Sequence, residues 1–106
     1  MMKKLIIFLL MLVSIYGCRI EEEKTNADNA AELCIAECKS RLQAGEDFSN
    51  GPCLSNVIIE DWVCDVAHKP RQDIDNQPEN QCSAFRAGQA HHFVELNINC
   101  DIIKIY

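Results

Sequence analysis

The chain has 106 residues, with 10 Lys and Arg against 16 Asp and Glu, and seven cysteines. This length allows one small domain and excludes a TIM barrel or a complete dinucleotide-binding fold, which both need a much longer chain. The formal charge of -6 argues against nucleic acid as a partner, because an acidic surface repels phosphates. Seven cysteines in so short a chain indicate either a disulfide framework or metal ligation.

The N-terminus has the organisation of a secretory leader. Two lysines at positions 3 and 4 precede an unbroken apolar run over residues 5–13. A helix that spans a bilayer needs about 20 apolar residues. The run is too short for that, and its basic start is typical of a signal peptide.

The leader ends in Ile15-Tyr16-Gly17-Cys18. An aliphatic residue and a small residue before a cysteine resemble the lipobox of prokaryotic lipoproteins. The resemblance implies cleavage after Gly17 and a diacylglycerol thioether on Cys18. Two or more acyl chains make a stable membrane anchor, so we expect the mature protein on the outer face of the cytoplasmic membrane or in the cell envelope.

Three segments follow from this interpretation: a signal peptide over 1–17, the lipidated cysteine and a flexible polar tether over 18–29, and a small disulfide-rich domain over 30–106. Cleavage removes two lysines, which changes the formal charge from -6 to -8. A thioether cannot form a disulfide, so lipidation leaves an even set of cysteines. That set is Cys34, Cys38, Cys53, Cys64, Cys82 and Cys100.

The first predicted element of the domain is a helix from Ala30 to about Gln43. Asn29 is suited to cap its start, and Gly45 is suited to end it. Cysteines 34 and 38 recur at a spacing of four, so they share one face of this helix.

Extended segments are predicted over 57–59 and 62–67, where Trp62, Cys64 and Val66 fall on one face. Residues 68–81 contain two prolines and many polar side chains, which indicates a long irregular loop pinned by Cys64 and Cys82. Segments 90–96 and 102–106 read as a C-terminal hairpin. The predicted fold is α+β: an N-terminal helix packed on a small antiparallel sheet with a C-terminal hairpin, stabilised by disulfides.

The cysteines have an energetic reason in a domain this small. One apolar core of this size supplies about 3–5 kcal/mol, and each disulfide adds roughly 2–4 kcal/mol. Cβ atoms at i and i+4 of a helix lie about 5–6 Å apart, whereas a disulfide needs about 3.5–4.5 Å. Cys34 and Cys38 are therefore expected to bond elsewhere, to Cys53, Cys64 or Cys82.

A thiol enzyme is the main alternative to a binding or structural domain. Segments 63–68 and 90–95 faintly resemble the transglutaminase-like thiol fold. The resemblance implies a triad of Cys64, His92 (or His91) and Asp101, in which an imidazole activates a thiolate. Against this, Pro70 forbids the long helix that follows the nucleophile in that fold, and Asp101 falls in a predicted turn.

A surface metal site is the second alternative, using His68 with His91 or His92. No Cys-x2-Cys pair occurs in the sequence, which argues against structural zinc. Adjacent residues of a strand point to opposite faces, so His91 and His92 are not expected to share a site. We therefore predict no bound metal and no cofactor.

A small basic spot is a third candidate site, formed by His68, Lys69 and Arg71 with Arg86 nearby. It would suit an anionic ligand or lipid headgroups. Segments 50–56, 61–68, 78–82 and 90–95 resemble small secreted cysteine-rich proteins of prokaryotes, archaea in particular, and this resemblance implies no activity. The sequence thus predicts a membrane-anchored extracytoplasmic domain with a binding or structural role and no catalytic one.

Overall fold

Helix α2 (Asn26–Gln43) begins with a capping box. The computed structural model describes residues 23–106; the predicted leader, Cys18 and the start of the predicted tether lie outside the described residues. The Thr25 hydroxyl accepts a hydrogen bond from the Asp28 N–H (3.1 Å), and the Asp28 carboxylate accepts one from the Thr25 N–H (3.3 Å). Because these bonds satisfy donors left open at a helix start, the helix begins before the predicted Ala30. Residues 26–29 are helical and do not belong to a tether.

The helix ends where the sequence predicts. Gly45 has a φ of +86°, and its N–H donates to the Leu42 carbonyl (3.0 Å), a geometry that favours glycine after a last helical turn. Within residues 23–106, no helix is both long and apolar enough to cross a bilayer.

Four strands form one mixed sheet in the order β1-β2-β3-β4. Their bounds are β1 Cys53–Ile59, β2 Trp62–Val66, β3 His92–Leu96 and β4 Ile102–Ile105. The α+β fold and the C-terminal hairpin are confirmed, but the sheet is not wholly antiparallel, because β2 and β3 are parallel. Segment 67–91 returns the chain to the end at which β2 began, and only such a long crossover can join parallel neighbours.

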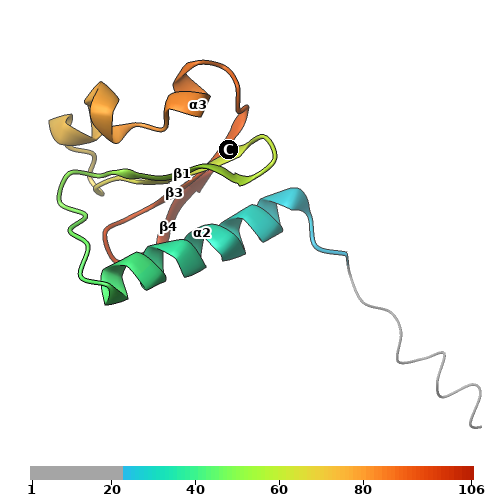
Figure 1. The fold of residues 1–106 in the computed structure, drawn as a ribbon, viewed down its shortest axis with the longest axis horizontal. Coiled ribbons are helices and arrows are strands. Elements are labelled where there is room, and N and C mark those ends of the chain that lie inside the picture. Colours follow the sequence, from blue (N-terminus) through green and yellow to red (C-terminus); the bar gives the residue numbers. More distant parts are fainter. Residues whose placement is uncertain (1–22) are drawn as a thin grey trace, which may run out of the picture.

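The sheet separates two layers (Figure 1). Helix α2 packs on one face, and the crossover covers the other with the short helices η1 (Asp73–Asn76), η2 (Pro78–Asn80) and α3 (Ser83–Arg86). As the alternation predicts, Trp62, Cys64 and Val66 join the core beneath α2. Val63 belongs to the second apolar cluster, under α3.

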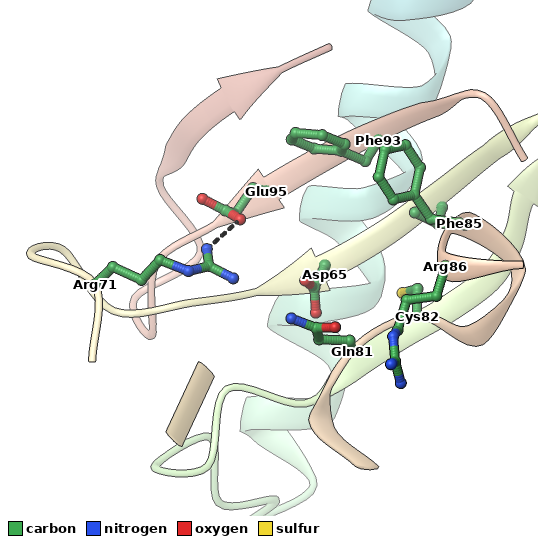
Figure 2. A pocket seen from close by; sticks show the side chains of 9 residues that line it. Asp65, Arg71, Gln81, Cys82, Phe85, Arg86, Phe93 and Glu95 are labelled. Carbon is green, nitrogen blue, oxygen red and sulfur yellow. Dashed lines mark hydrogen bonds and ion pairs between the residues drawn. The ribbon is translucent and has the colours of Figure 1, made fainter. Parts of the chain in front are cut away.

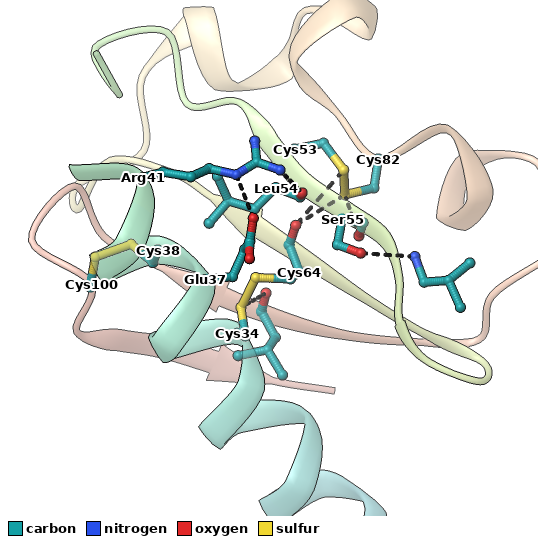
Figure 3. Close-up of a disulfide and its surroundings, with 12 residues drawn as sticks. Cys34, Glu37, Cys38, Arg41, Cys53, Leu54, Ser55, Cys64, Cys82 and Cys100 are labelled. Carbon is teal, nitrogen blue, oxygen red and sulfur yellow. Dashed lines mark hydrogen bonds and ion pairs between the residues drawn. A yellow bond between two sulfur atoms is a disulfide. The ribbon is translucent and has the colours of Figure 1, made fainter. Parts of the chain in front are cut away.

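Three disulfides connect these layers (Figure 3). The pairs are Cys34–Cys64, Cys38–Cys100 and Cys53–Cys82. The first two join α2 to β2 and to the turn before β4, and the third joins β1 to the crossover. All six predicted half-cystines are therefore paired, and Cys34 and Cys38 are not bonded to each other.

One detail of the predicted pairing is wrong: Cys38 bonds to Cys100, which was not among its expected partners. The crossover is held on both sides as predicted, by Cys64 through Cys34 and by Cys82 through Cys53. Cys100 reaches α2 because it occupies a left-handed position (φ 68°) in the turn between β3 and β4. This position depends on how the hairpin folds over the helix, which the cysteine spacing does not report.

Candidate functional site

A pocket of about 410 Å³ lies on the outer face of the sheet, beneath the crossover (Figure 2). Its strand residues follow from the parallel register of β2 and β3, in which Val63 is opposite Phe93 and Asp65 is opposite Glu95. Alternation turns these odd-numbered side chains away from α2. The remaining lining residues come from the crossover: Arg71, Gln81, Cys82, Phe85 and Arg86.

One end of the pocket is aromatic. The rings of Phe85 and Phe93 meet edge to face with centroids 5.1 Å apart. Phe93 also stacks on Tyr106 at 5.3 Å, with the Lys104 ammonium 5.9 Å from the Phe93 centroid. Edge-to-face and offset stacked pairs are the favoured aromatic geometries, so this end offers a firm apolar wall.

The other end is acidic. Arg71 forms an ion pair with Glu95 (3.0 Å) and donates a second hydrogen bond to Asn76 (2.7 Å). Within the described residues, the Asp65 Oδ1 atom is buried and has no hydrogen-bond partner. Burial, followed by the neighbouring Glu95 charge, raises the pKa of Asp65 to about 8, so this carboxyl is mostly neutral at pH 7.

The raised pKa of Asp65 makes the stability of the fold fall as pH rises from acidic to slightly alkaline values. Between the ordinary value of 3.8 and about 8, folded Asp65 keeps a proton that the unfolded chain releases, so stability falls as pH rises through that window. A difference of one pKa unit between the folded and unfolded chain corresponds to about 1.4 kcal/mol. Partial solvent exposure of Asp65 reduces this effect, so we expect the free energy of unfolding to fall by about 2 kcal/mol between pH 5 and pH 8. Asp65→Asn should remove most of this loss in urea unfolding measured across pH.

The matched control is Glu79→Gln, which removes an exposed carboxylate from the crossover. It should retain the loss of stability on going from pH 5 to pH 8. Equal pH profiles for the wild type and Asp65→Asn would contradict the assignment of the raised pKa to Asp65.

The predicted basic spot is divided between two hollows. Arg71 and Arg86 line the outer-face pocket, whereas His68 and Lys69 line a separate hollow beside the turn between β3 and β4. Glu95 partly neutralises Arg71. The four basic residues therefore do not form a single anion site, because they line two different hollows and Glu95 pairs with one of them.

Asp75 is the carboxylate that organises the first part of the crossover. Its buried side chain accepts hydrogen bonds from the Gln72 N–H (2.9 Å) and the His68 N–H (3.0 Å), and it contacts His68 Nδ1 at 2.9 Å. Burial alone raises the pKa of Asp75, but these hydrogen bonds outweigh it and hold the pKa below its usual value. The long loop is thus tied at its start by Asp75 and at its end by Cys82.

The structure removes the thiol-enzyme triad. Cys64 is buried and bonded to Cys34, so it has no thiolate to act as a nucleophile. The His92 ring stacks on Trp62 with centroids 4.6 Å apart. Asp101 lies in the turn before β4, where its N–H donates to Asn97 (3.0 Å). The local resemblance carried no information about the partner of Cys64, which is why it misled.

The histidines of the alternative metal site, His68 with His91 or His92, are not brought together. His68 contacts Asp75, whereas His91 and His92 both approach Asp61, with Nδ1–Oδ1 at 2.6 Å and Nε2–Oδ2 at 3.7 Å. The two histidines share a carboxylate, contrary to expectation, because His91 precedes β3 and escapes its alternation. Across residues 23–106, no group of three or more His, Cys, Asp or Glu side chains is arranged to hold a metal ion.

The sequence interpretation missed the acidic and aromatic lining of the pocket. The available signal was that Asp65 and Glu95 interrupt apolar strands at positions facing away from the helix. Their meeting depends on the parallel register, which was not predicted. Comparison of the chain with protein-family models, curated proteins and solved structures found no match.

Proposed function

We propose that the chain is a lipid-anchored extracytoplasmic domain that binds a small ligand and carries out no catalysis. The observation that carries the location is that the six cysteines following Cys18 are all disulfide-bonded. Disulfides form and persist in oxidising compartments outside the cytoplasm. The apolar leader and the lipobox-like residues 15–18 provide the route to that compartment and the anchor.

Binding is supported by the outer-face pocket. Its volume of about 410 Å³ lies within the roughly 300–1,000 Å³ usual for small-ligand sites. An apolar wall with a few convergent polar groups is also usual for such sites. The locked Cys64 favours this function over the thiol enzyme.

The anchor can be tested by changing Cys18 to serine in the full chain, expressed in a bacterial host. We expect the wild type to fractionate with membranes and Cys18→Ser to be released, because serine cannot accept the thioether. Non-reducing peptide mass spectrometry should find Cys18 as a lipidated N-terminus, together with the three disulfides. Ser14→Ala, a change in the leader that leaves residues 15–18 intact, should stay in the membrane.

An intact leader together with reduced cysteines would contradict the proposed location. Equal membrane association of the wild type and Cys18→Ser would contradict the lipid anchor. Ligand binding has a separate test, which is an NMR screen of cationic, anionic and uncharged small molecules. Shifts should concentrate on Phe85, Phe93 and Glu95, and a screen that perturbs none of the pocket residues would contradict ligand binding there.

A further inference from the structure

We propose, resting on the binding function above, that the outer-face pocket takes a small organic cation: a primary ammonium group attached to an apolar body. The acidic end of the pocket would hold the ammonium, and the aromatic end would hold the body. Four features of the site support this assignment: the hydrogen-bond balance, the charge balance, the apolar wall and the spacing between the two ends.

The hydrogen-bond balance favours a donor as ligand. Once ionised, Asp65 presents Oδ1 as an acceptor that is buried without a partner among the described residues, and such an atom costs about 1–3 kcal/mol. An ammonium group carries three N–H donors and no acceptor. A ligand carboxylate would place further acceptors beside an acceptor that already lacks a donor.

Once the Asp65 carboxyl is ionised, the charge balance at this end also favours a cation. Asp65 and Glu95 are direct neighbours across β2 and β3, and like charges placed opposite each other destabilise a sheet. Arg71 pairs with Glu95, which leaves Asp65 without an ion-pair partner within the described residues. Arg86 on α3 also lines the pocket, but its side chain is exposed to solvent.

Binding of a ligand ammonium would displace the proton held by the Asp65 carboxyl. At neutral pH the Asp65 carboxyl holds a proton; when the ammonium takes up its place, that proton leaves to solvent and an ion pair forms. The groups that set this exchange are Glu95 and Asp75, which favour the protonated form, and Arg71, which favours the carboxylate. Since the pKa of Asp65 is about 8, the affinity should rise with pH up to that value.

The apolar wall determines the nature of the ligand's body and its distance from the ammonium group. Val63 and Phe93 lie two positions before Asp65 and Glu95 on the same face, which is about 6–7 Å along the strands. Phe85 closes this end from the crossover side (Figure 2). A ligand of matching length has a ring or short alkyl body about two carbons from its nitrogen.

The test uses three probes of one shape: 2-phenylethylamine, 3-phenylpropionate and 2-phenylethanol, titrated into the detergent-solubilised mature protein and followed by NMR and calorimetry. We expect the amine to bind at the pocket residues at least tenfold more tightly than the other two probes. Its affinity should rise about tenfold per pH unit from pH 6 to pH 7.5 and level off above pH 8. Calorimetry at pH 6.5 in buffers of different ionisation enthalpy should report release of about one proton.

Two variants separate charge from fold. Asp65→Asn should lower the affinity for the amine at least tenfold and abolish the proton release, whereas Glu79→Gln should bind as the wild type does. The wild-type pH profile is itself decisive if Asp65→Asn does not fold. Equal or tighter binding of the carboxylate or the alcohol in the pocket would overturn the cation assignment and leave the binding function standing. If no probe perturbs the pocket, both proposals fail.

Discussion

Replacing both Cys38 and Cys100 by alanine is expected to lower the free energy of unfolding by about 4 kcal/mol. This disulfide joins residues 62 apart in sequence, and the loop-entropy relation gives about 4 kcal/mol for a cross-link of that span. One apolar core of this size contributes only about 3–5 kcal/mol, so this single disulfide contributes about as much stability as the core does. Urea unfolding under non-reducing conditions measures the loss directly.

The matched control is the double change Cys53→Ala and Cys82→Ala, which opens a disulfide of separation 29. The same relation predicts a loss smaller by about 0.7 kcal/mol, because the closed loop is about half as long. Both pairs connect separate layers of the fold, so the comparison isolates loop length. A larger loss for the Cys53–Cys82 pair would show that strain or packing, and not chain entropy, sets the contribution of these bonds.

Gly51→Ala is expected to destabilise the protein by about 3 kcal/mol. Gly51 has a φ of +64°, and a Cβ at this position would collide with Asp75 Oδ1 and lie 3.1 Å from the Val66 carbonyl oxygen. The left-handed backbone costs an alanine about 1–2 kcal/mol. Moving Asp75 also weakens its hydrogen bonds to His68 and Gln72, which costs about 1–3 kcal/mol more. Thermal or urea unfolding would measure the change.

Gly45→Ala isolates the backbone contribution, since Gly45 has a φ of +86° and its added Cβ would meet nothing within 4 Å. It should cost only about 1–2 kcal/mol. In an Asp75→Ala background, the cost of Gly51→Ala should fall close to that of Gly45→Ala in the wild type, because the colliding carboxylate is gone and only the close Val66 carbonyl oxygen remains. Equal losses for Gly51→Ala and Gly45→Ala in the wild type would refute the close packing of Gly51 on Asp75.

Local patterns in the sequence predicted much of the fold. The spacing of Cys34 and Cys38 placed them on one helix face and ruled out a bond between them, and Gly45 ended that helix. Alternation in β2 sent Trp62 and Cys64 to the core. Each of these inferences concerns neighbours within a few residues, where backbone geometry alone relates one side chain to the next.

The disulfide partners and the pocket depended on contacts between distant segments. Nothing near Cys38 in sequence specifies Cys100, and the resemblance that suggested Cys64 as a nucleophile contained no trace of Cys34. The basic spot failed partly for the same reason, since the carboxylate that pairs with Arg71 comes from Glu95, 24 residues further along the chain. The helix start was missed because the Thr25–Asp28 box was not recognised within a polar stretch.

By itself, the sequence determined the fold class, the identity of the half-cystines and the expectation of an oxidising destination, because composition and short-range periodicity are enough for these. Tertiary structure alone decided the parallel pairing of β2 with β3 and, with it, the meeting of Asp65 and Glu95. Strand direction depends on which end of the sheet the crossover returns to, and that is set by the summed packing of the whole segment 67–91. The chemistry of the pocket therefore arises from a long-range choice that no local pattern records.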